Sequence, residues 1–356
     1  MERKLASIRV ISDIQPIEGA DMIELAIVDG WKVVVAKNVG HKIGDHVVYC
    51  EIDSFLPIKE DFEFLRKSSY KKMGDQEGFR LKTIKLRGQV SQGLILPMSV
   101  FGDFGWTAYE GLDVTERLGI VKYEPPIPAE LSGKVKGYFP SFLRKTDEER
   151  VQNLTKEYEE YRLQSKHLFY VTEKLDGSSS TYYINDGTFG VCSRNLELAE
   201  PEPFVPGMEL CDDGIERPKQ ENTFWKVARE LDLKNKMESL GINICFQGEL
   251  IGEGIQGNPY KIKGQTVKFF NAFDIDSQQR ISMPKFVEFM EKLDLDYVPF
   301  LETPFALPNT VEDMLKYAEG KSKLNDNTER EGVVVRSHDN TISFKAISNK
   351  FLLDND

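Results

Sequence analysis

The sequence is poor in cysteine, contains no long apolar run and has no excess of basic residues. Its four cysteines, Cys50, Cys192, Cys211 and Cys245, are far apart and include no Cys-x-x-Cys pair, which argues against a disulfide framework and a zinc site. No run approaches the ~18 apolar residues of a membrane span, and the first residues lack the apolar segment of a signal peptide. We therefore expect a cytoplasmic protein with reduced thiols.

The formal net charge of the chain is −12, which argues against a protein that coats nucleic acid without sequence preference. It does not exclude an enzyme whose basic residues are confined to one groove. Hydrophobic residues make up 40% of the chain and charged residues 29%, as in folded globular proteins. A length of 356 residues allows two domains, each with its own core.

Short β-prone runs follow one another in the first hundred residues, without long helical patterns between them. They lie at residues 5–11, 23–28 and 32–35, and another follows the turn at Gly44-Asp45. Strands at this spacing predict a small β-barrel, similar to an OB-fold. We assign residues 1–105 to this domain.

Residues 79–87 carry four cations and no acid. Arg80 and Lys82 alternate with apolar residues, and Lys85 and Arg87 do the same after a bulge-like break. A strand with such a basic face could follow a phosphate backbone. The competing interpretation is an edge strand that its charges protect from pairing with another chain.

The Gly- and Pro-rich stretch at 105–143 predicts a connection between domains. The following stretch, "KTDEERVQNLTKEYEEYRL", predicts a helix with Thr146 and Glu149 as its capping box. We assign residues 106–165 to this linker and helix. Arg150 would contact the 5′-phosphate of a nucleic acid or the phosphates of a nucleotide, unless it belongs to a solvated first helical turn.

The remaining residues, 166–356, show longer strands with helices between them. Charged residues interrupt or end the apolar strands, where a charge is costly unless it faces a site. They are Lys174, Asp176, Arg194, Glu249, Asp274, Glu331 and Lys345. Lys174 lies in "EKLDGSSS", at the end of one strand and before an Asp-Gly turn. A deprotonated lysine amine is a nucleophile, although a single KxDG match more often marks an ordinary surface lysine.

The motifs KxDG, SRN, GEL, FxxFDI, EGVVVR and FK follow one another along this second part. Their order resembles that of the covalent nucleotidyltransferases, which include ATP-dependent RNA and DNA ligases and GTP-dependent mRNA capping enzymes. With an OB-like domain in front, the chain is most similar to the RNA ligase 5 family. The resemblance implies an α+β fold: an N-terminal OB-type β-barrel, then an ATP-grasp-like or ligase-type nucleotidyltransferase domain of antiparallel sheets with flanking helices.

The resemblance also implies a chemistry for these residues. Lys174 would attack the α-phosphate of ATP and carry AMP, which then passes to the 5′-phosphate of an RNA end before a 3′-hydroxyl displaces it. Lys345 would neutralise the developing charge and, with a divalent metal, lower the pKa of Lys174. Asp176, Glu249 and Glu331 would hold hydrated Mn²⁺ or Mg²⁺.

The same resemblance implies further binding roles. Arg194 would bind the ribose, Phe270 would stack on adenine, and Glu173 would frame the base; Asp274 receives no role. The predicted nucleotide-binding set is Glu173, Lys174, Arg194, Glu249, Phe270, Glu331 and Lys345. The predicted nucleic-acid-binding set is Arg80, Lys82, Lys85, Arg87 and Arg150. The expected partners are RNA ends, in nicked or duplex RNA, bound by a monomer that acts in RNA repair.

One position departs from the family pattern, and other functions stay open. Relatives often carry Lys-x-Lys in the last motif, but Ile347 stands at the second position and Lys350 is the nearest substitute. The alternatives within the class are a DNA ligase and a capping guanylyltransferase. Outside it are an OB-type RNA-binding module with an inert second domain and a Schiff-base lysine enzyme. The carboxylate set fits metal and phosphate chemistry better than a carbonyl substrate.

Overall fold

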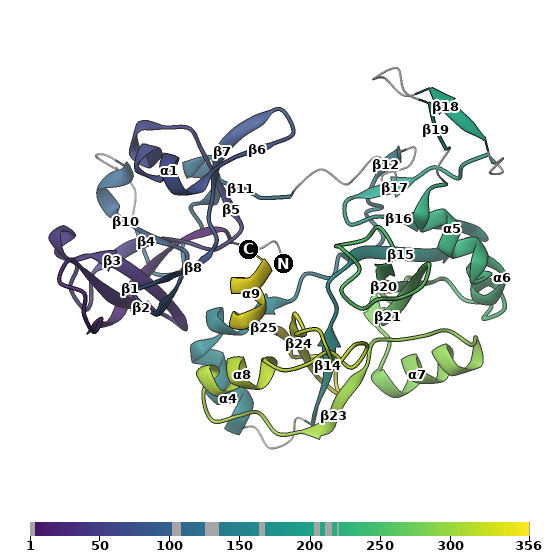
Figure 1. The fold of residues 1–356 in the computed structure, drawn as a ribbon. Coiled ribbons are helices and arrows are strands. Elements are labelled where there is room, and N and C mark those ends of the chain that lie inside the picture. Colours follow the sequence, from purple (N-terminus) through teal and green to yellow (C-terminus); the bar gives the residue numbers. More distant parts are fainter. Residues whose placement is uncertain are drawn as a thin grey trace.

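The computed structural model describes residues 4–101, 108–124, 135–163, 168–202, 207–210, 216–218 and 221–355, and only the backbone of 208–210 and 216–218. The chain forms an N-terminal domain of β-strands and a C-terminal domain of two sheets with flanking helices (Figure 1). Cys211 and residues 125–134 of the predicted connection lie outside these ranges. No helix in the described ranges is long and apolar enough to cross a membrane.

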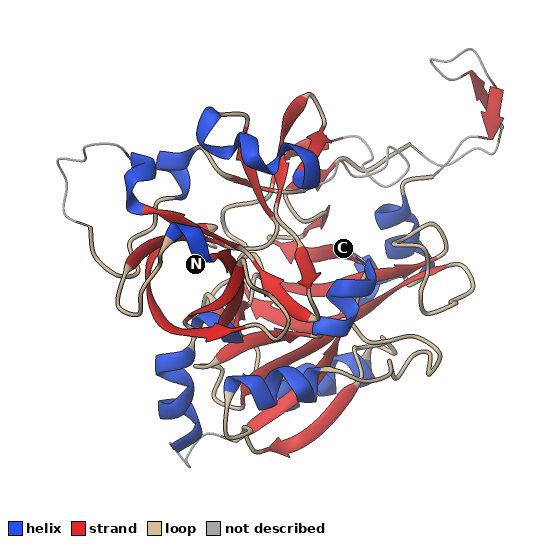
Figure 2. Cartoon of the chain, turned by 60° about the vertical axis from the view of Figure 1, so that its left-hand side comes forward, coloured by secondary structure: helices blue, strands red, loops and turns tan. Residues whose placement is uncertain are grey.

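The N-terminal domain is built from antiparallel strands, which curl around a core in Figure 2. Its first sheet contains, in spatial order, β10 (Leu94–Pro97), β4 (His46–Cys50), β1 (Ala6–Pro16), β2 (Ile23–Val28) and β3 (Trp31–Ala36). The second sheet contains β11 (Val121–Lys122), β5 (Ser54–Pro57), β7 (Gln76–Arg80) and β6 (Tyr70–Met73). A hairpin of β8 (Thr83–Leu86) and β9 (Gln89–Gln92) closes the barrel beside β3, where Val34 N–H donates to Ser91 Oγ. The short helices are η1 (Lys37–Val39), η2 (Glu60–Leu65), α1 (Arg66–Ser69), η3 (Met98–Phe101) and α2 (Thr115–Leu118).

Two sequence predictions for this half are corrected by the structure. The basic stretch at 79–87 is not one strand, because Leu81 is buried in the core and its N–H donates to Ser54 O, after which β8 begins in a separate sheet. The stretch at 108–122 is not a free connection either. Val114 and Leu118 fill the N-terminal core, which the Gly- and Pro-rich composition of the region did not indicate.

The C-terminal domain contains two large sheets. The seven-stranded sheet holds β12 (Val135–Tyr138), β17 (Leu196–Leu198), β16 (Thr188–Cys192), β15 (Ser178–Asn185), β20 (Ile244–Gly252), β21 (Gln265–Asp274) and β22 (Gln279–Arg280). The five-stranded sheet holds β13 (Glu149–Arg150), β25 (Ser343–Ile347), β24 (Gly332–Ser337), β14 (Phe169–Lys174) and β23 (Phe300–Phe305). β18 (Met208–Leu210) pairs with β19 (Glu216–Pro218). The pairing is antiparallel as predicted, except between β13 and β25, which are parallel.

Helices pack against both sheets, so that apolar side chains are buried on each. The seven-stranded sheet shares a core with α5 (Thr223–Glu230), α6 (Leu233–Glu238) and α7 (Met283–Lys292). The five-stranded sheet shares one with α4 (Thr155–Leu163) and α8 (Val311–Ala318). The remaining elements are η4 (Val151–Asn153) and α9 (Asn349–Asn355), which ends the described chain.

The helix predicted from residue 145 begins ten residues later than expected, at Thr155 of α4. Residues 149–150 form β13 instead, and they pair with Phe344 and Lys345 of β25. The Thr146/Glu149 capping box is therefore wrong. Glu149 Oε1 accepts hydrogen bonds from Arg150 N–H and from Asn153 Nδ2, and the free edge of β25 offers backbone partners that the local sequence pattern cannot reveal.

The two domains are joined by a junction around Trp31, whose indole is fully buried. Its Nε1 donates to Asn153 Oδ1 at 2.6 Å, and Gly30 N–H donates to Gln152 O at 3.0 Å. On the apolar side, Ile347 and Leu352 of the C-terminal domain belong to the same buried cluster as Trp31. The end of the chain therefore packs into the N-terminal barrel.

We expect Leu352→Ala to lower the free energy of unfolding of the N-terminal domain by about 2 kcal/mol or more, since it removes buried methyl groups and leaves a cavity. Chemical denaturation followed by fluorescence would measure this. Leu163→Ala is the matched control, because that leucine on α4 is 65% exposed. Equal stability of the two variants would contradict the docking role of α9.

Candidate active site

Lys174 is the last residue of β14, and a carboxylate lies directly beside its amine. Its Nζ donates a hydrogen bond to Glu331 Oε1 at 2.6 Å. The register of β14 and β24 sets Lys174 opposite Gly332, so the residue before Gly332 falls next to the lysine. The turn that follows passes close to β20, and a Cβ on Gly177 would collide with Leu250 O. The structure thus brings together the predicted nucleophile and one predicted metal ligand.

The other two predicted metal ligands, Asp176 and Glu249, interact electrostatically with the same lysine. Burial raises the pKa of Glu249 to about 8 and that of Asp176 to about 7, and the charge of Glu331 adds to both shifts. Glu331 Oε2 is buried and accepts no hydrogen bond from the described residues. Crowded carboxylates of this kind fit a divalent cation, which would replace their protons.

The carboxylates do not form a ready-made direct coordination sphere. Within the described ranges, no three His, Cys, Asp or Glu side chains are grouped closely enough to hold a metal ion. Asp176, Glu249 and Glu331 would therefore hold the ion through its water ligands, as Mg²⁺ often binds.

Neighbouring carboxylates dominate the pKa of Lys174. Burial alone would lower it, but the charges of Glu331 and Glu249 outweigh burial, and the pKa is raised. Lys345 Nζ pairs with Asp147 Oδ1 at 3.2 Å. That Lys345 and a divalent metal together lower the pKa of Lys174 stays a prediction. Among the protein's own groups, the charged amine is therefore the favoured form. Deprotonation requires that the surrounding carboxylate charges be neutralised.

A loop between β20 and β21 holds the turn after the lysine. Tyr260 Oη accepts a hydrogen bond from Asp176 N–H at 2.6 Å, and Gln256 Nε2 donates to Gly177 O at 3.4 Å. Gln256 and Asn258 adopt positive φ, a strained conformation that often accompanies functional sites. The sequence analysis missed Tyr260, although its glycine-rich surroundings, "GEGIQGNPY", indicated an unusual loop.

Phe270 lies at a β-bulge of β21, and bulges redirect side chains toward sites. It lines a small cavity together with Tyr170 and Thr172 of β14 and with Phe300 of β23. The cavity therefore lies between the two sheets. Stacking of Phe270 on adenine stays a prediction, and this placement favours it.

Glu173 points to the other side of β14 from Lys174, because neighbouring strand residues alternate. Its carboxylate is 1% exposed and accepts a hydrogen bond from Lys323 N–H at 2.7 Å. Burial raises its pKa. The structure does not place Glu173 in the lining of the Phe270 cavity, so its role in framing a base stays a prediction.

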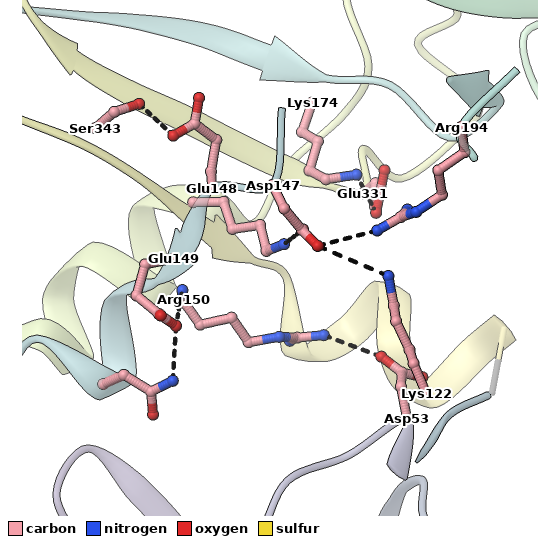
Figure 3. A network of polar contacts seen from close by, with 12 residues as sticks. Asp53, Lys122, Asp147, Glu148, Glu149, Arg150, Lys174, Arg194, Glu331 and Ser343 are labelled. Atoms are coloured by element: carbon pink, nitrogen blue, oxygen red, sulfur yellow. Dashed lines mark hydrogen bonds and ion pairs between the residues drawn. The ribbon is translucent and has the colours of Figure 1, made fainter. Parts of the chain in front are cut away.

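Arg194 and Lys345 meet at Asp147, which accepts from Arg194 Nη2 at 3.1 Å (Figure 3). Lys122 Nζ lies 3.9 Å from the same carboxylate. Arg194 Nε also pairs with Glu124 at 3.3 Å. The sequence analysis missed Asp147 and Lys122, since one lies in the stretch interpreted as a helix and the other in the stretch interpreted as a linker.

The predicted nucleic-acid-binding residues are divided between two places. Arg80 and Arg150 both pair with Asp53, at 3.4 Å in each case, and Arg150 is only 5% exposed. Lys82, two residues after Arg80, is half-buried. Lys85, by contrast, is exposed on the β8–β9 hairpin. Arg87, at the turn of that hairpin, is exposed as well.

Ile347, which stands where relatives often carry a second lysine in the last motif, has a structural role in this chain. Ile347 is 3% exposed and packs with the N-terminal cluster. Lys350 is on α9, where its Nζ donates to Glu329 Oε1 at 2.8 Å. Lys350 therefore has a partner of its own. Asp274, to which no role was assigned, accepts a hydrogen bond from Ser277 N–H in a turn.

Glu148 anchors the segment that carries Asp147. Its Oε1 accepts from Arg336 Nη2 at 2.8 Å and lies 3.4 Å from Arg280 Nη2, and its Oε2 accepts from Ser343 Oγ. Burial alone would raise the pKa of Glu148, but the charges of Arg336 and Arg280 and the hydrogen bonds from Ser343 and Arg336 together outweigh burial and lower the pKa to about 2. This carboxylate fixes the start of β13 to the five-stranded sheet.

We expect Glu148→Gln to destabilise the protein near pH 7 by on the order of 3 kcal/mol, because Arg336 loses its buried counterion. A carboxylate with a lowered pKa stabilises the fold above its unfolded pKa, 4.5, and loses that contribution as the pH falls toward about 2. The difference between variant and wild type should therefore shrink below about pH 4.5. Chemical denaturation at several pH values checks this; a pH-independent difference would contradict it.

Comparison with known proteins agrees with this geometry. A family model described as RNA ligase matches residues 167–350, and one described as an OB-fold domain matches residues 5–98. No curated protein sequence matches the chain.

Solved structures of Naegleria gruberi RNA ligase match almost the whole chain. The ligase with PPi is 42% identical, with a TM-score of 0.87 over 99% of this chain and 98% of that one. A lysine-to-alanine mutant with ATP and Mn is 42% identical, with a TM-score of 0.87 over 98% of both chains. A glutamate-to-alanine mutant with AMP and Mn is 41% identical, with a TM-score of 0.85 over 98% of both. The chain therefore belongs to the RNA ligase family, with an OB-fold domain in front of its nucleotidyltransferase domain.

Proposed function

We propose that the protein is an ATP-dependent RNA ligase that joins 3′-hydroxyl and 5′-phosphate RNA ends. The observation that carries this proposal is the lysine amine of Lys174 held 2.6 Å from Glu331 among further carboxylates. Similar ligase structures that contain ATP, AMP and Mn support it.

In the first step, the neutral amine of Lys174 attacks the α-phosphorus of ATP. The bond from that phosphorus to the bridging oxygen breaks, pyrophosphate leaves, and AMP stays on the lysine as a phosphoramidate. Glu331 Oε1 is the acceptor nearest to the amine and is positioned to take its proton. A divalent ion held by Asp176, Glu249 and Glu331 would neutralise the charges that raise the pKa of the lysine and polarise the phosphate.

In the next two steps, the polynucleotide replaces the lysine. The 5′-phosphate of the RNA attacks the AMP phosphorus and releases Lys174. The 3′-hydroxyl then attacks the 5′-phosphorus, and AMP leaves. Lys345 and Arg194, which lie together at Asp147, supply positive charge where phosphates react. Holding both ends in place supplies the proximity that makes the last step fast.

The proposal also covers the kind of RNA substrate, the oligomeric state and the cellular compartment. We propose that the substrate is nicked or duplex RNA in RNA repair, with Lys85 and Arg87 of the β8–β9 hairpin against the backbone. We further propose a cytoplasmic monomer. Buried, free Cys50, Cys192 and Cys245 support a reducing compartment.

Lys174→Ala should abolish covalent labelling by α-labelled ATP and reduce RNA sealing at least a thousandfold, because it removes the amine that attacks in the first step. Lys285→Ala is the control, since this lysine is exposed on α7. Denaturing gel electrophoresis would measure the label that stays covalently attached to each protein. Label from GTP but not ATP would indicate a capping enzyme, and a variant that keeps its label would overturn the role of Lys174.

A double variant, Lys85→Ala with Arg87→Ala, should weaken sealing of nicked RNA on the order of tenfold while covalent AMP formation is unchanged, since two phosphate contacts are lost. Lys285→Ala with Lys316→Ala is the charge-matched control on α7 and α8. Nicked duplexes with RNA or DNA on either side would be compared. Unchanged sealing of nicked RNA by the hairpin variant would contradict the proposed contact between this hairpin and the RNA.

A further inference from the structure

One carboxylate, that of Asp147, binds three cations from three parts of the fold (Figure 3). Lys345 comes from β25 of the five-stranded sheet, and Arg194 follows β16 of the seven-stranded sheet. Lys122 comes from β11 of the N-terminal domain and lies 3.9 Å away. Asp147 is therefore a point at which both sheets and both domains meet through charge.

Three cations gathered at one place repel each other, and each pair costs free energy that rises steeply in a partly buried site. The cluster is partly buried, since the Lys345 side chain is 12% exposed and that of Asp147 is 30% exposed. The cations hold the pKa of Asp147 well below its usual range, so the carboxylate stays charged. Glu124 Oε1 lies 3.3 Å from both Lys122 Nζ and Arg194 Nε and shares the task of holding these two cations. Asp147 pairs with both of them and also with Lys345, so its permanent negative charge links all three.

The carboxylate is also fixed from behind. Its neighbour Glu148 is held by Arg336 at 2.8 Å. Glu149, two residues after Asp147, belongs to β13 and pairs with Phe344 of β25, the residue before Lys345. Asp147 therefore directly precedes a segment anchored to the same sheet as Lys345.

We propose that Asp147 is a positioning residue, which holds Lys345, Arg194 and Lys122 as one set for the phosphates of the substrate in lysine adenylylation. This inference rests on the proposed RNA ligase function. Asp147 takes no part in bond making, since its negative charge would repel a phosphate. It acts through the cations, and through Lys122 it ties the N-terminal domain to the first step.

The competing interpretation treats Asp147 as a counterion that ATP must displace. The two interpretations predict opposite kinetics. A positioning residue supports the rate at saturating ATP, so its loss lowers kcat for adenylylation. A displaced counterion opposes ATP binding, so its loss lowers KM for ATP and leaves kcat unchanged.

The test is single-turnover formation of covalent AMP at several ATP concentrations with Asp147→Asn, which keeps the shape and removes the charge. We expect the rate constant at saturating ATP to fall about tenfold or more, because removing one unit of fixed charge weakens the attraction that holds Lys345 together with Arg194 and Lys122. Asp147→Glu should recover part of the loss. Glu159→Gln, which breaks an exposed pair with Arg162 on α4, is the matched control.

The outcomes separate the hypotheses. A wild-type rate constant in Asp147→Asn, or only a lower KM, overturns this inference. A wild-type enzyme that forms no covalent AMP overturns the proposed function itself. If thermal unfolding shows that Asp147→Asn is not folded, Lys122→Gln serves instead and should lower the rate constant severalfold, whereas an unchanged rate constant would again overturn the inference.

Discussion

A lysine amine partly buried beside a carboxylate is the constraint on which the rest of this structure depends. Lys174 is a poor nucleophile while Glu331 and Glu249 hold it in its charged form, and those carboxylates are themselves costly to bury without a counterion. The positive lysine offsets part of the carboxylate charge, but this pairing also keeps the amine protonated. The site therefore needs a cation for the carboxylates and further positive charge for the phosphates, and both requirements determine which strand ends must meet.

The register of the five-stranded sheet brings two charged residues of the site to one face. In the five-stranded sheet, Lys174, Gly332 and Ile347 lie opposite one another on β14, β24 and β25. Side chains in one such row share a face and are about 5 Å apart from strand to strand. Lys345, two residues before Ile347, therefore projects to the same face as Lys174. Glycine fits between the two other residues, because a Cβ on Gly332 would collide with Ala346 O.

The sequence allowed Lys174 and the carboxylates near it to be selected because each lies within a recognisable motif. Their places differ from the expectation of strand ends, since Glu249 lies inside β20 and Glu331 directly precedes β24. Lys122 escaped prediction because β11 is a two-residue strand inside the stretch interpreted as a linker. Asp147 and Tyr260 escaped it because they lie in irregular segments and their partners are distant in sequence. The helix expected from Thr146 fails for the same reason. A capping pattern describes local contacts alone, whereas the edge of β25 competes for that segment from almost two hundred residues away.

The N-terminal domain is connected to the chemistry through one continuous stretch of chain. β25 carries Lys345 toward the site and then Ile347 into the barrel cluster, and α9 follows directly and packs against β8. The exposed cations of the β8–β9 hairpin thus rest on the same stretch that positions Lys345. Arg80, expected on the RNA, instead pairs with Asp53 and stacks on Tyr123 at 4.6 Å. Its charge stabilises the barrel beside the junction, which leaves the hairpin as the part of the predicted basic strand that is free to meet a polynucleotide. The hairpin that we propose as an RNA contact and the lysine that we propose as a phosphate contact are therefore linked by one continuous stretch of packed chain.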